Sequence, residues 1–253
     1  PSACDLLDRR LLSLGRDADH SFLDLIHPNA EAGLFIEFSG SSHEDLKRRL
    51  SNANTLLKST DFQYVVSRET TGIHEVERLW KLPANVVSLL AGLKGEARPL
   101  PFVEDIAVPP ERISEFLKLS QRTFQKHEVT ATLYAHAASG QLHLRPIMPV
   151  PHPGRAEQIE AISRDLYRHV KTVGGTISGE HGDGLSRTAF IRSQYGPLYR
   201  RLQQVKDIFD PQRLLNPDKI ISNDGQITLR HLRKTEVPPK PANEPEDQTL
   251  LPV

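Results

Sequence analysis

The chain has 253 residues, of which 38% are hydrophobic and 25% charged, a balance typical of a globular protein with a sizeable core. Its 32 basic residues equal its 32 acidic ones, so the net charge gives no indication of a nucleic-acid partner. The single cysteine, Cys4, excludes an intrachain disulfide and a cysteine-ligated iron–sulfur cluster within these residues. No apolar run approaches the roughly 20 residues that span a bilayer, so no transmembrane segment is expected. Because the chain begins at Pro1 and its only methionine is Met148, we expect it to be a piece of a longer protein.

The first part of the chain mixes helical and strand-like patterns. The expected elements are a helix over residues 4–14, a strand over 33–38, a helix over 43–58, a strand over 62–66 and a helical region over 79–90. Ser41 or Ser42 can cap the helix over 43–58, because acidic residues follow in its first turn. Pro83 should break the last helical region.

The rest of the chain continues this mixture and ends in a different composition. The expected elements are a strand over 102–108, a helix over 110–127, strands over 129–136 and 142–148, a helix over 155–172 and one or two helices over 187–209. Intermixed helices and strands with a hairpin predict an α+β fold in which helices cover one face of an antiparallel sheet. Residues 235–253 contain five prolines among charged residues, which is typical of a linker.

The segment YAHAASGQLHLRP, residues 134–146, contains two histidines on neighbouring predicted strands. If the turn centres between Ser139 and Gly140, His136 and His143 become direct cross-strand partners with Cβ atoms about 5 Å apart. Two imidazoles so placed can share one metal ion, and Tyr134 and Arg145 would lie on the same face. A hairpin with two half-exposed histidines and no ion is the alternative.

The segment GGTISGEHGDG, residues 174–184, has five glycines in eleven positions, which permit a close approach of backbone to ligand. Glu180 within it could complete a site of two histidines and one carboxylate, and His181 could accept a proton. The spacing matches neither a Walker loop nor a dinucleotide fingerprint. A flexible turn with an exposed acid and histidine is the alternative.

An acidic pair, Glu104 and Asp105, lies inside the apolar stretch FVEDIAV. In a strand, one carboxylate would point to each face. We expect at least one of them to have a hydrogen-bonding or charged partner, in a structural rather than a catalytic role.

Four segments, in this order, carry a resemblance to a known family: FVEDIAVPPERISEFL, YAHAASGQLHLRP, GGTISGEHGDGLSR and QYGPLYRRLQQVKDIFDPQRLLNPDKII. Together they resemble the C-terminal domain of the FAD-linked oxidases, which include D-lactate dehydrogenase, D-2-hydroxyglutarate dehydrogenase and the flavoprotein component of glycolate oxidase. The resemblance implies a ferredoxin-like α+β cap domain over residues 1–222 and a separate FAD domain outside this chain. The HLRP ending and the segment after residue 222 look most like the branch fused to an iron–sulfur domain, for which residues 223–253 would be the tail and linker.

The resemblance also implies an activity, which is the FAD-dependent oxidation of a D-2-hydroxy acid to the 2-oxo acid. The sequence does not name the electron acceptor. We expect the protein to lie in the cytoplasm or peripherally on a membrane. It assigns His136, His143 and Glu180 to a divalent metal such as zinc or manganese, His181 to the general base beside the substrate hydroxyl, Arg145 to the substrate and Asn216 to the flavin. The chain alone is expected to be inactive and to bind no FAD tightly.

Three departures from the family pattern bear on which hydroxy acid is the substrate. Residues 138–141 replace a Gly-Asp-Gly-Asn motif, Pro83 stands in place of an arginine, and Val103 stands in place of a lysine. They leave the metal set and His181 unchanged. Two other functions stay open from the residues alone: a metal-dependent hydrolase, which would need no flavin, and a non-catalytic cap or docking module.

Overall fold

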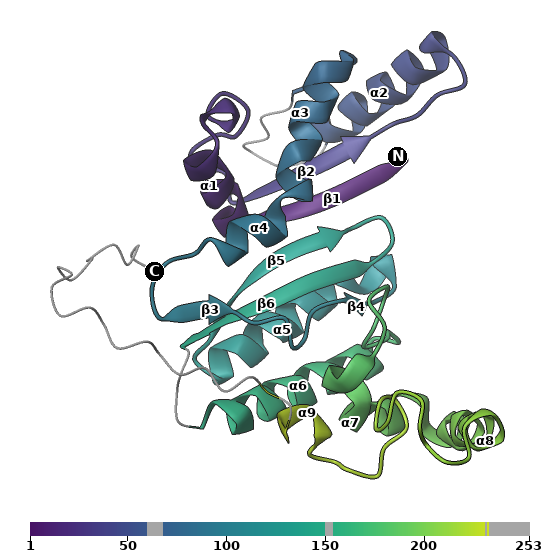
Figure 1. The fold of residues 1–253 in the computed structure, drawn as a ribbon. Coiled ribbons are helices and arrows are strands. Elements are labelled where there is room, and N and C mark those ends of the chain that lie inside the picture. Colours follow the sequence, from purple (N-terminus) through teal and green to yellow (C-terminus); the bar gives the residue numbers. More distant parts are fainter. Residues whose placement is uncertain (60–67, 150–153, 231, 233–253) are drawn as a thin grey trace, which may run out of the picture.

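The computed structural model describes residues 1–59, 68–149, 154–230 and 232. Its strands form an antiparallel sheet in the order β2-β1-β5-β6-β3, with β4 also paired to β6 (Figure 1). The strands are β1 (Ala3–Asp8), β2 (Ala32–Glu37), β3 (Ala97–Pro99), β4 (Ile106–Ala107), β5 (Thr130–His136) and β6 (Gln141–Pro149). The helices are α1 (Arg9–Ala18), α2 (His43–Lys58), α3 (Ile73–Ala84), α4 (Val86–Ala91), α5 (Ile113–Lys126), α6 (Arg155–Thr172), α7 (Gly184–Tyr195), α8 (Tyr199–Phe209) and α9 (Ile227–Arg230).

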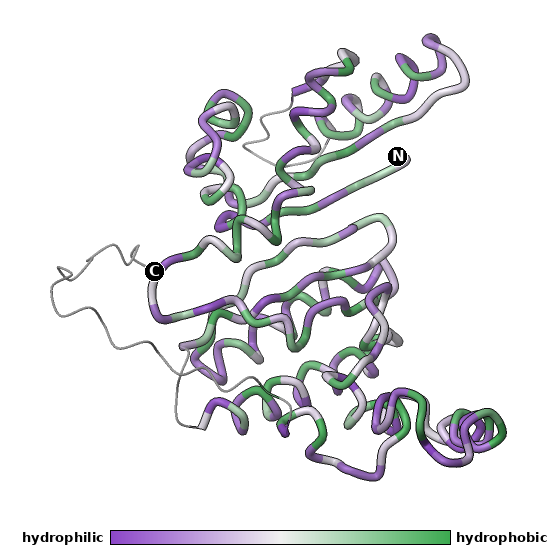
Figure 2. The backbone as a smooth tube through the Cα atoms, viewed as in Figure 1, coloured by the Kyte–Doolittle hydropathy of each residue, from purple (hydrophilic) through white to green (hydrophobic). Residues whose placement is uncertain are grey.

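One face of the sheet packs against α5 and α6 and forms the larger hydrophobic core. Ala135 of β5 and Leu142 and Leu144 of β6 are buried there, because alternate residues of a strand point to the same face. The two helices contribute apolar stripes at helical spacing, namely Phe116 and Phe124 from α5 and Ile159, Ile162, Leu166 and Val170 from α6. Figure 2 shows the resulting alternation of hydrophobic and hydrophilic stretches along these helices.

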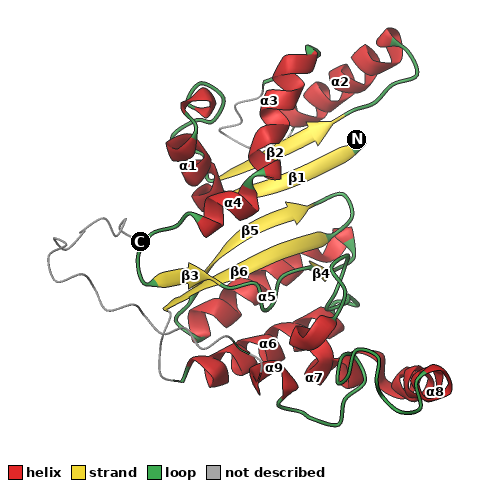
Figure 3. Ribbon diagram, viewed as in Figure 1, coloured by secondary structure: helices red, strands yellow, loops and turns green. Residues whose placement is uncertain are grey.

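The opposite face of the sheet carries α1, α3 and α4 over one part and the candidate site over another. Leu7 of β1 is fully buried in a second core cluster, and Tyr134 of β5 packs at its edge. The helical members of this cluster are Leu11, Leu12, Leu82, Val86 and Leu90. Helices therefore lie on both sides of the sheet, as Figure 3 shows, rather than on one face as expected. The predicted α+β fold with an antiparallel sheet covered by helices is confirmed.

Two predicted elements were wrong in detail. Residues 4–14 divide at Asp8 into a strand and a helix, because the Asp8 carboxylate accepts a hydrogen bond from the Leu11 N–H and caps α1. Within 102–108 only Ile106 and Ala107 form a strand, since Asp105 has a φ of +69°, which extended backbone does not allow. The strand predicted over 62–66 lies outside the described residues.

Most other predicted boundaries agree closely with the structure, although the helical region expected over 79–90 already begins at Ile73. The α2 helix begins after Ser42, whose hydroxyl accepts the Asp45 N–H, and Pro83 lies at the end of α3, just before α4. Residues beyond the expected boundary at 222 continue to pack, because Ile227 of α9 is buried and Thr228 bonds to α7. The proline-rich stretch at 235–253 lies outside the part that the structure describes. Among the described helices, none is long and apolar enough to span a bilayer.

Asp165 on α6 joins this helix to the end of α5. Its carboxylate accepts hydrogen bonds from Lys126 Nζ at 2.7 Å and His127 Nε2 at 3.0 Å, and these bonds hold its pKa below the usual range. A carboxyl group whose pKa falls on folding stabilises the protein above its unfolded pKa of about 4. The group loses that contribution as the pH falls through its pKa in the folded state.

We therefore expect Asp165→Asn to lower the free energy of unfolding by about 1 kcal/mol at neutral pH. The difference from the wild type should shrink below about pH 4, where the wild-type carboxylate begins to lose its advantage. Urea unfolding followed by circular dichroism at several pH values measures this. Asp207→Asn, which removes an exposed ion pair with Arg213, is the control and should change little. A difference for Asp165→Asn that stays constant down to about pH 2 would contradict the prediction.

Candidate active site

The β5–β6 hairpin places His136 and His143 on the face of the sheet that α5 and α6 do not cover. Their ring centroids lie 5.4 Å apart. They are diagonal rather than direct partners, because Tyr134 pairs with His143 and His136 with Gln141. The predicted register was therefore wrong by two residues, with the turn centred on Ala138 and Ser139. A shift of two residues keeps each side chain on its face, so the two histidines still meet.

The turn that sets this register depends on Gly140. Its φ is +80°, and a Cβ at this position would lie 1.8 Å from the Val108 carbonyl oxygen. Only glycine allows both the backbone conformation and the close approach of the segment after β4. The turn therefore also fixes how Glu104 and Asp105, just before β4, meet the hairpin.

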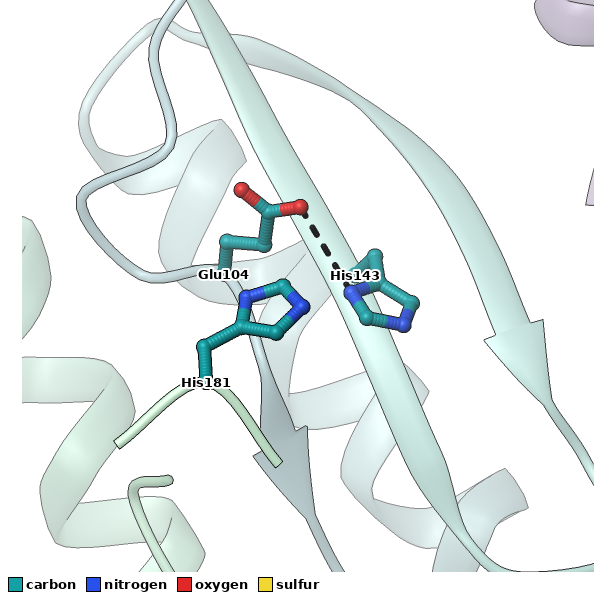
Figure 4. A group of neighbouring side chains, drawn as sticks. All are labelled: Glu104, His143 and His181. Carbon is teal, nitrogen blue, oxygen red and sulfur yellow. Dashed lines mark ion pairs between the residues drawn. The ribbon is translucent and has the colours of Figure 1, made fainter. Parts of the chain in front are cut away.

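His143 is buried and lies between two carboxylates. Its Nδ1 is 3.5 Å from Glu104 Oε1, and its Nε2 is 3.8 Å from Glu180 Oε1. Glu104 also forms an ion pair with Arg145, which follows His143 by two residues on the same face. Figure 4 shows Glu104, His143 and His181 approaching one another from three separate segments of the chain.

Asp105 anchors the segment of residues 174–184, called here the glycine-rich loop. Its carboxylate is fully buried and accepts five hydrogen bonds, although a carboxylate offers only about four lone-pair sites. The donors are Gln141 Nε2 (2.8 Å), Ser178 Oγ (3.1 Å) and the backbone N–H groups of Gly179 (3.0 Å), Glu180 (2.9 Å) and His181 (2.9 Å). The loop is thereby held so that Glu180 and His181 face the hairpin.

Arg187 of α7 also binds the glycine-rich loop. Its buried guanidinium donates to the carbonyl oxygens of Ile177, Gly182 and Glu104. These bonds connect the two ends of the loop to the segment before β4. Sequence reasoning missed Arg187, since a lone arginine in a helix carries no signal of its buried partners.

The structure brings together the side chains that the sequence analysis assigned to metal binding and to proton transfer. The ligand atoms of His136, His143 and Glu180 lie within 4.8 Å of one another. His181 Nε2 is 3.5 Å from Glu180 Oε1, and the His181 and His143 rings are 5.3 Å apart. Glu180 and His181 are about half exposed, so the site is open on the loop side. Metal binding itself stays a prediction.

Two other groups of side chains also have ligand atoms within 4.8 Å of one another, but the contacts of these side chains disfavour an ion. One group is Glu104, His143 and His181, and the other is Asp105, Glu180 and His181. The Arg145 guanidinium on Glu104 would repel a cation there. Asp105 has no free lone pair, because its five donors occupy them. The set of His136, His143 and Glu180 is therefore the best candidate.

The buried carboxylates of the site are stabilised in their charged forms. Burial alone would raise the pKa of Glu104, but the contacts with His143 and Arg145 outweigh it, and the net pKa lies below the usual value. The pKa of Asp105 is likewise lowered, because its N–H donors outweigh its burial. Burial and the bond to Asp5 raise the pKa of Tyr134, which therefore stays a neutral donor. Both members of the acidic pair thus have partners, as expected, although they do not lie in a strand.

The last predicted site residue, Asn216, lies apart from this cluster in the loop after α8. Its φ is +43°, and its contacts are local, with Lys219. The apolar side chains beside it are exposed, Leu214 at 72% and Leu215 at 62%. The described structure therefore does not connect Asn216 to the two histidines.

Comparison with known proteins places this chain in a family. Residues 1–220 match the C-terminal domain of the FAD linked oxidases. The chain belongs to this family. The resemblance carried by the four motifs is therefore confirmed.

Relatives of this FAD-linked oxidase domain are much longer than the chain. It is 32% identical over 191 residues to D-2-hydroxyglutarate dehydrogenase of Pseudomonas putida, covering 75% of the chain and 19% of that protein. It is 30% identical over 249 residues to D-2-hydroxyglutarate dehydrogenase of Pantoea ananatis, covering 92% of the chain and 24% of that protein. The chain thus spans about a fifth to a quarter of the length of these relatives.

A solved structure shares the fold of the domain. It is 4-ethylphenol oxidase from Gulosibacter chungangensis in its isoeugenol complex, with a TM-score of 0.50 and 11% identity. The match covers 86% of this chain and 47% of that one. At this identity the likeness shows the fold alone.

The variant Asp105→Asn tests the anchor of the glycine-rich loop. The amide keeps the shape but turns one acceptor oxygen into a donor that faces the N–H groups of the loop. Hydrogen bonds to a charged group contribute about 1.5–3 kcal/mol, and a buried unpaired donor costs about 1–3 kcal/mol. We expect the free energy of unfolding to fall by about 3 kcal/mol and amide exchange over residues 178–182 to become faster.

Ser178→Ala is the matched control, because it removes one neutral donor from the same carboxylate and should cost about 1 kcal/mol. Urea unfolding and hydrogen exchange read by mass spectrometry give both quantities. An Asp105→Asn protein as stable as Ser178→Ala, with unchanged exchange in the loop, would show that Asp105 does not anchor it.

Proposed function

We propose that the protein oxidises a D-2-hydroxy acid to the 2-oxo acid, with FAD as the hydride acceptor and a divalent metal ion at the substrate. The observation that carries this proposal is the convergence of His136, His143 and Glu180 beside His181, within a domain of the FAD-linked oxidases. The relatives named D-2-hydroxyglutarate dehydrogenase support the class of substrate.

The side chains present fit a divalent metal ion. His143 Nε2 is buried and has no hydrogen-bond partner among the described residues, although it points toward Glu180. Leaving such an atom unpaired costs free energy, which an ion would recover. Two imidazoles and a carboxylate suit zinc or manganese. An ion held there would act as a Lewis acid that lowers the pKa of the substrate hydroxyl.

His181 is the group that we assign to accept the hydroxyl proton, at Nε2. The side chain is half exposed and 3.5 Å from Glu180, so it can reach a substrate bound at an ion that Glu180 would help to hold. Its backbone N–H is fixed by Asp105, which limits the movement of the residue. General base catalysis of this kind contributes about 10²–10⁴-fold to the rate.

Arg145 is the group that we assign to the substrate carboxylate. One of its terminal nitrogens forms an ion pair with the Glu104 carboxylate, while a guanidinium has five N–H donors in all. The remaining donors can grip a second carboxylate, and Glu104 fixes the plane of the guanidinium for this purpose. Because the side chain is largely buried, its charge acts in a poorly hydrated environment and binds an anion more strongly.

FAD supplies the hydride acceptor for the substrate carbon. We assign its binding mainly to a part of the protein outside residues 1–253, with Asn216 at the edge of the contact. The exposed Leu214 and Leu215 beside Asn216 support this, since apolar side chains are rarely so exposed without a partner surface. The iron–sulfur module that would carry electrons onward stays a prediction for the remainder of the protein.

The test uses the full-length protein with its flavin. Reduction of the flavin by D-2-hydroxy acids, followed by bleaching of its visible absorption, measures the proposed reaction. We expect His181→Asn to lower the rate of reduction about 10²–10⁴-fold with normal flavin content, because only the proton acceptor is lost. His74→Asn, at a fully solvated position on α3, should be unaffected.

Other outcomes would redirect the assignment. Loss of flavin from His181→Asn would mean that this residue serves structure rather than proton transfer. Metal-dependent hydrolysis of an ester or amide by flavin-free protein would favour a hydrolase, and a wild-type flavin that no 2-hydroxy acid reduces would refute the proposed substrate class.

A further inference from the structure

Asp5 on β1 is a buried carboxylate that lies directly beside the candidate metal site. It is 5% exposed, and the strand register pairs it with His136 on β5. Its two oxygens have different partners. Oδ1 is 3.0 Å from His136 Nδ1, and Oδ2 accepts the hydroxyl of Tyr134 at 2.5 Å. A buried charge is tolerated only with such partners, so the three side chains form one connected unit.

This arrangement determines which nitrogen of His136 is free. A carboxylate only accepts hydrogen bonds, so the proton of a neutral His136 lies on Nδ1 and Nε2 keeps its lone pair. The same holds for His143, whose Nδ1 faces Glu104. Both rings therefore present Nε2 as the atom available to an ion, each backed by a carboxylate.

Tyr134 connects the two rings. Its own ring stacks on His143, with centroids 5.3 Å apart and an interplanar angle of 18°. Its hydroxyl holds the carboxylate that holds His136. One side chain therefore fixes the orientation of both histidines, by stacking on one and through Asp5 on the other.

We infer that Asp5 is a positioning residue that, held by the hydroxyl of Tyr134, fixes the tautomer and orientation of His136 for metal binding. The inference rests on the proposed metal site and assigns a residue outside the resemblance motifs. Carboxylates behind metal-binding histidines raise the basicity of the ligand and preorganise it, and losing one typically weakens metal affinity about 10–100-fold.

A purely structural role for Asp5 predicts a different result. The pairing of β1 with β5 rests on backbone hydrogen bonds, which an isosteric amide leaves in place. Asp5→Asn removes the charge behind His136 and leaves the volume unchanged. Tyr134→Phe keeps the stacked ring and removes only the hydroxyl that holds Asp5.

The experiment is a titration of metal-free, full-length protein with Zn²⁺ by isothermal calorimetry, repeated with Mn²⁺. We expect Asp5→Asn to weaken binding about 10–100-fold, and Tyr134→Phe to weaken it by a smaller factor of about 3–10, because Asp5 stays charged but less fixed. The nitrogen shifts of the His136 ring, measured by NMR, should change from one tautomer in the metal-free wild type to a mixture in Asp5→Asn.

Asp8→Asn is the matched control on the same strand. Its carboxylate is bound by the Leu11 and Leu133 N–H groups and points away from the histidines, so the variant should lose stability without losing metal affinity. Wild-type protein that binds neither ion would refute the metal site and this inference together. Wild-type protein that binds, with Asp5→Asn and Tyr134→Phe binding as tightly, would refute the role of Asp5 alone. If Asp5→Asn does not fold, Tyr134→Phe decides the question.

Discussion

The buried carboxylate of Asp105 connects the two parts of the candidate site. It lies just before β4, on a segment that the turn at Gly140 holds against the hairpin, and it binds the backbone of the glycine-rich loop. Without those N–H donors the carboxylate would be a buried charge with few partners, and without the carboxylate the loop would lose its fixed backbone. The positions of Glu180 and His181 relative to the histidines of β5 and β6 therefore depend on this carboxylate, together with Arg187.

The two faces of the sheet carry different kinds of side chain along β5 and β6. Alternation along β5 and β6 sends Ala135, Leu142 and Leu144 into the core under α5 and α6, and sends His136, His143 and Arg145 to the other side. The face under α5 and α6 buries the larger core, and the opposite face has a smaller one under α1, α3 and α4. The rest of that opposite face holds several polar and charged groups at close range. Arg145 pairs with Glu104, and Asp105 has its own set of donors. Such partners make a polar cluster rigid rather than costly.

The group of polar side chains at the candidate site is buried on the side of the sheet and open on the side of the glycine-rich loop. Asp5, Glu104 and Asp105 are buried beneath it, whereas Glu180 and His181 are about half exposed. Fixed carboxylates behind the imidazoles and an accessible carboxylate in front suit a site that receives a ligand from outside these residues. Leu214 and Leu215, in the loop after α8, are also exposed.

The sequence by itself determined the α+β class, most helix boundaries and the face shared by His136 and His143, because these follow from local spacing and from the period of a strand. The glycine-rich segment itself made Glu180 and His181 candidates, and the family motifs assigned their roles. Only the tertiary structure decided the partners of Asp5, Asp105 and Arg187, since each contacts residues far along the chain, 131 positions away for Asp5 and His136. It also decided the register of the hairpin, which depends on how Gly140 packs against Val108. Local patterns record which side chains share a face, whereas the partners of a buried charge are set by contacts between distant segments that no spacing encodes.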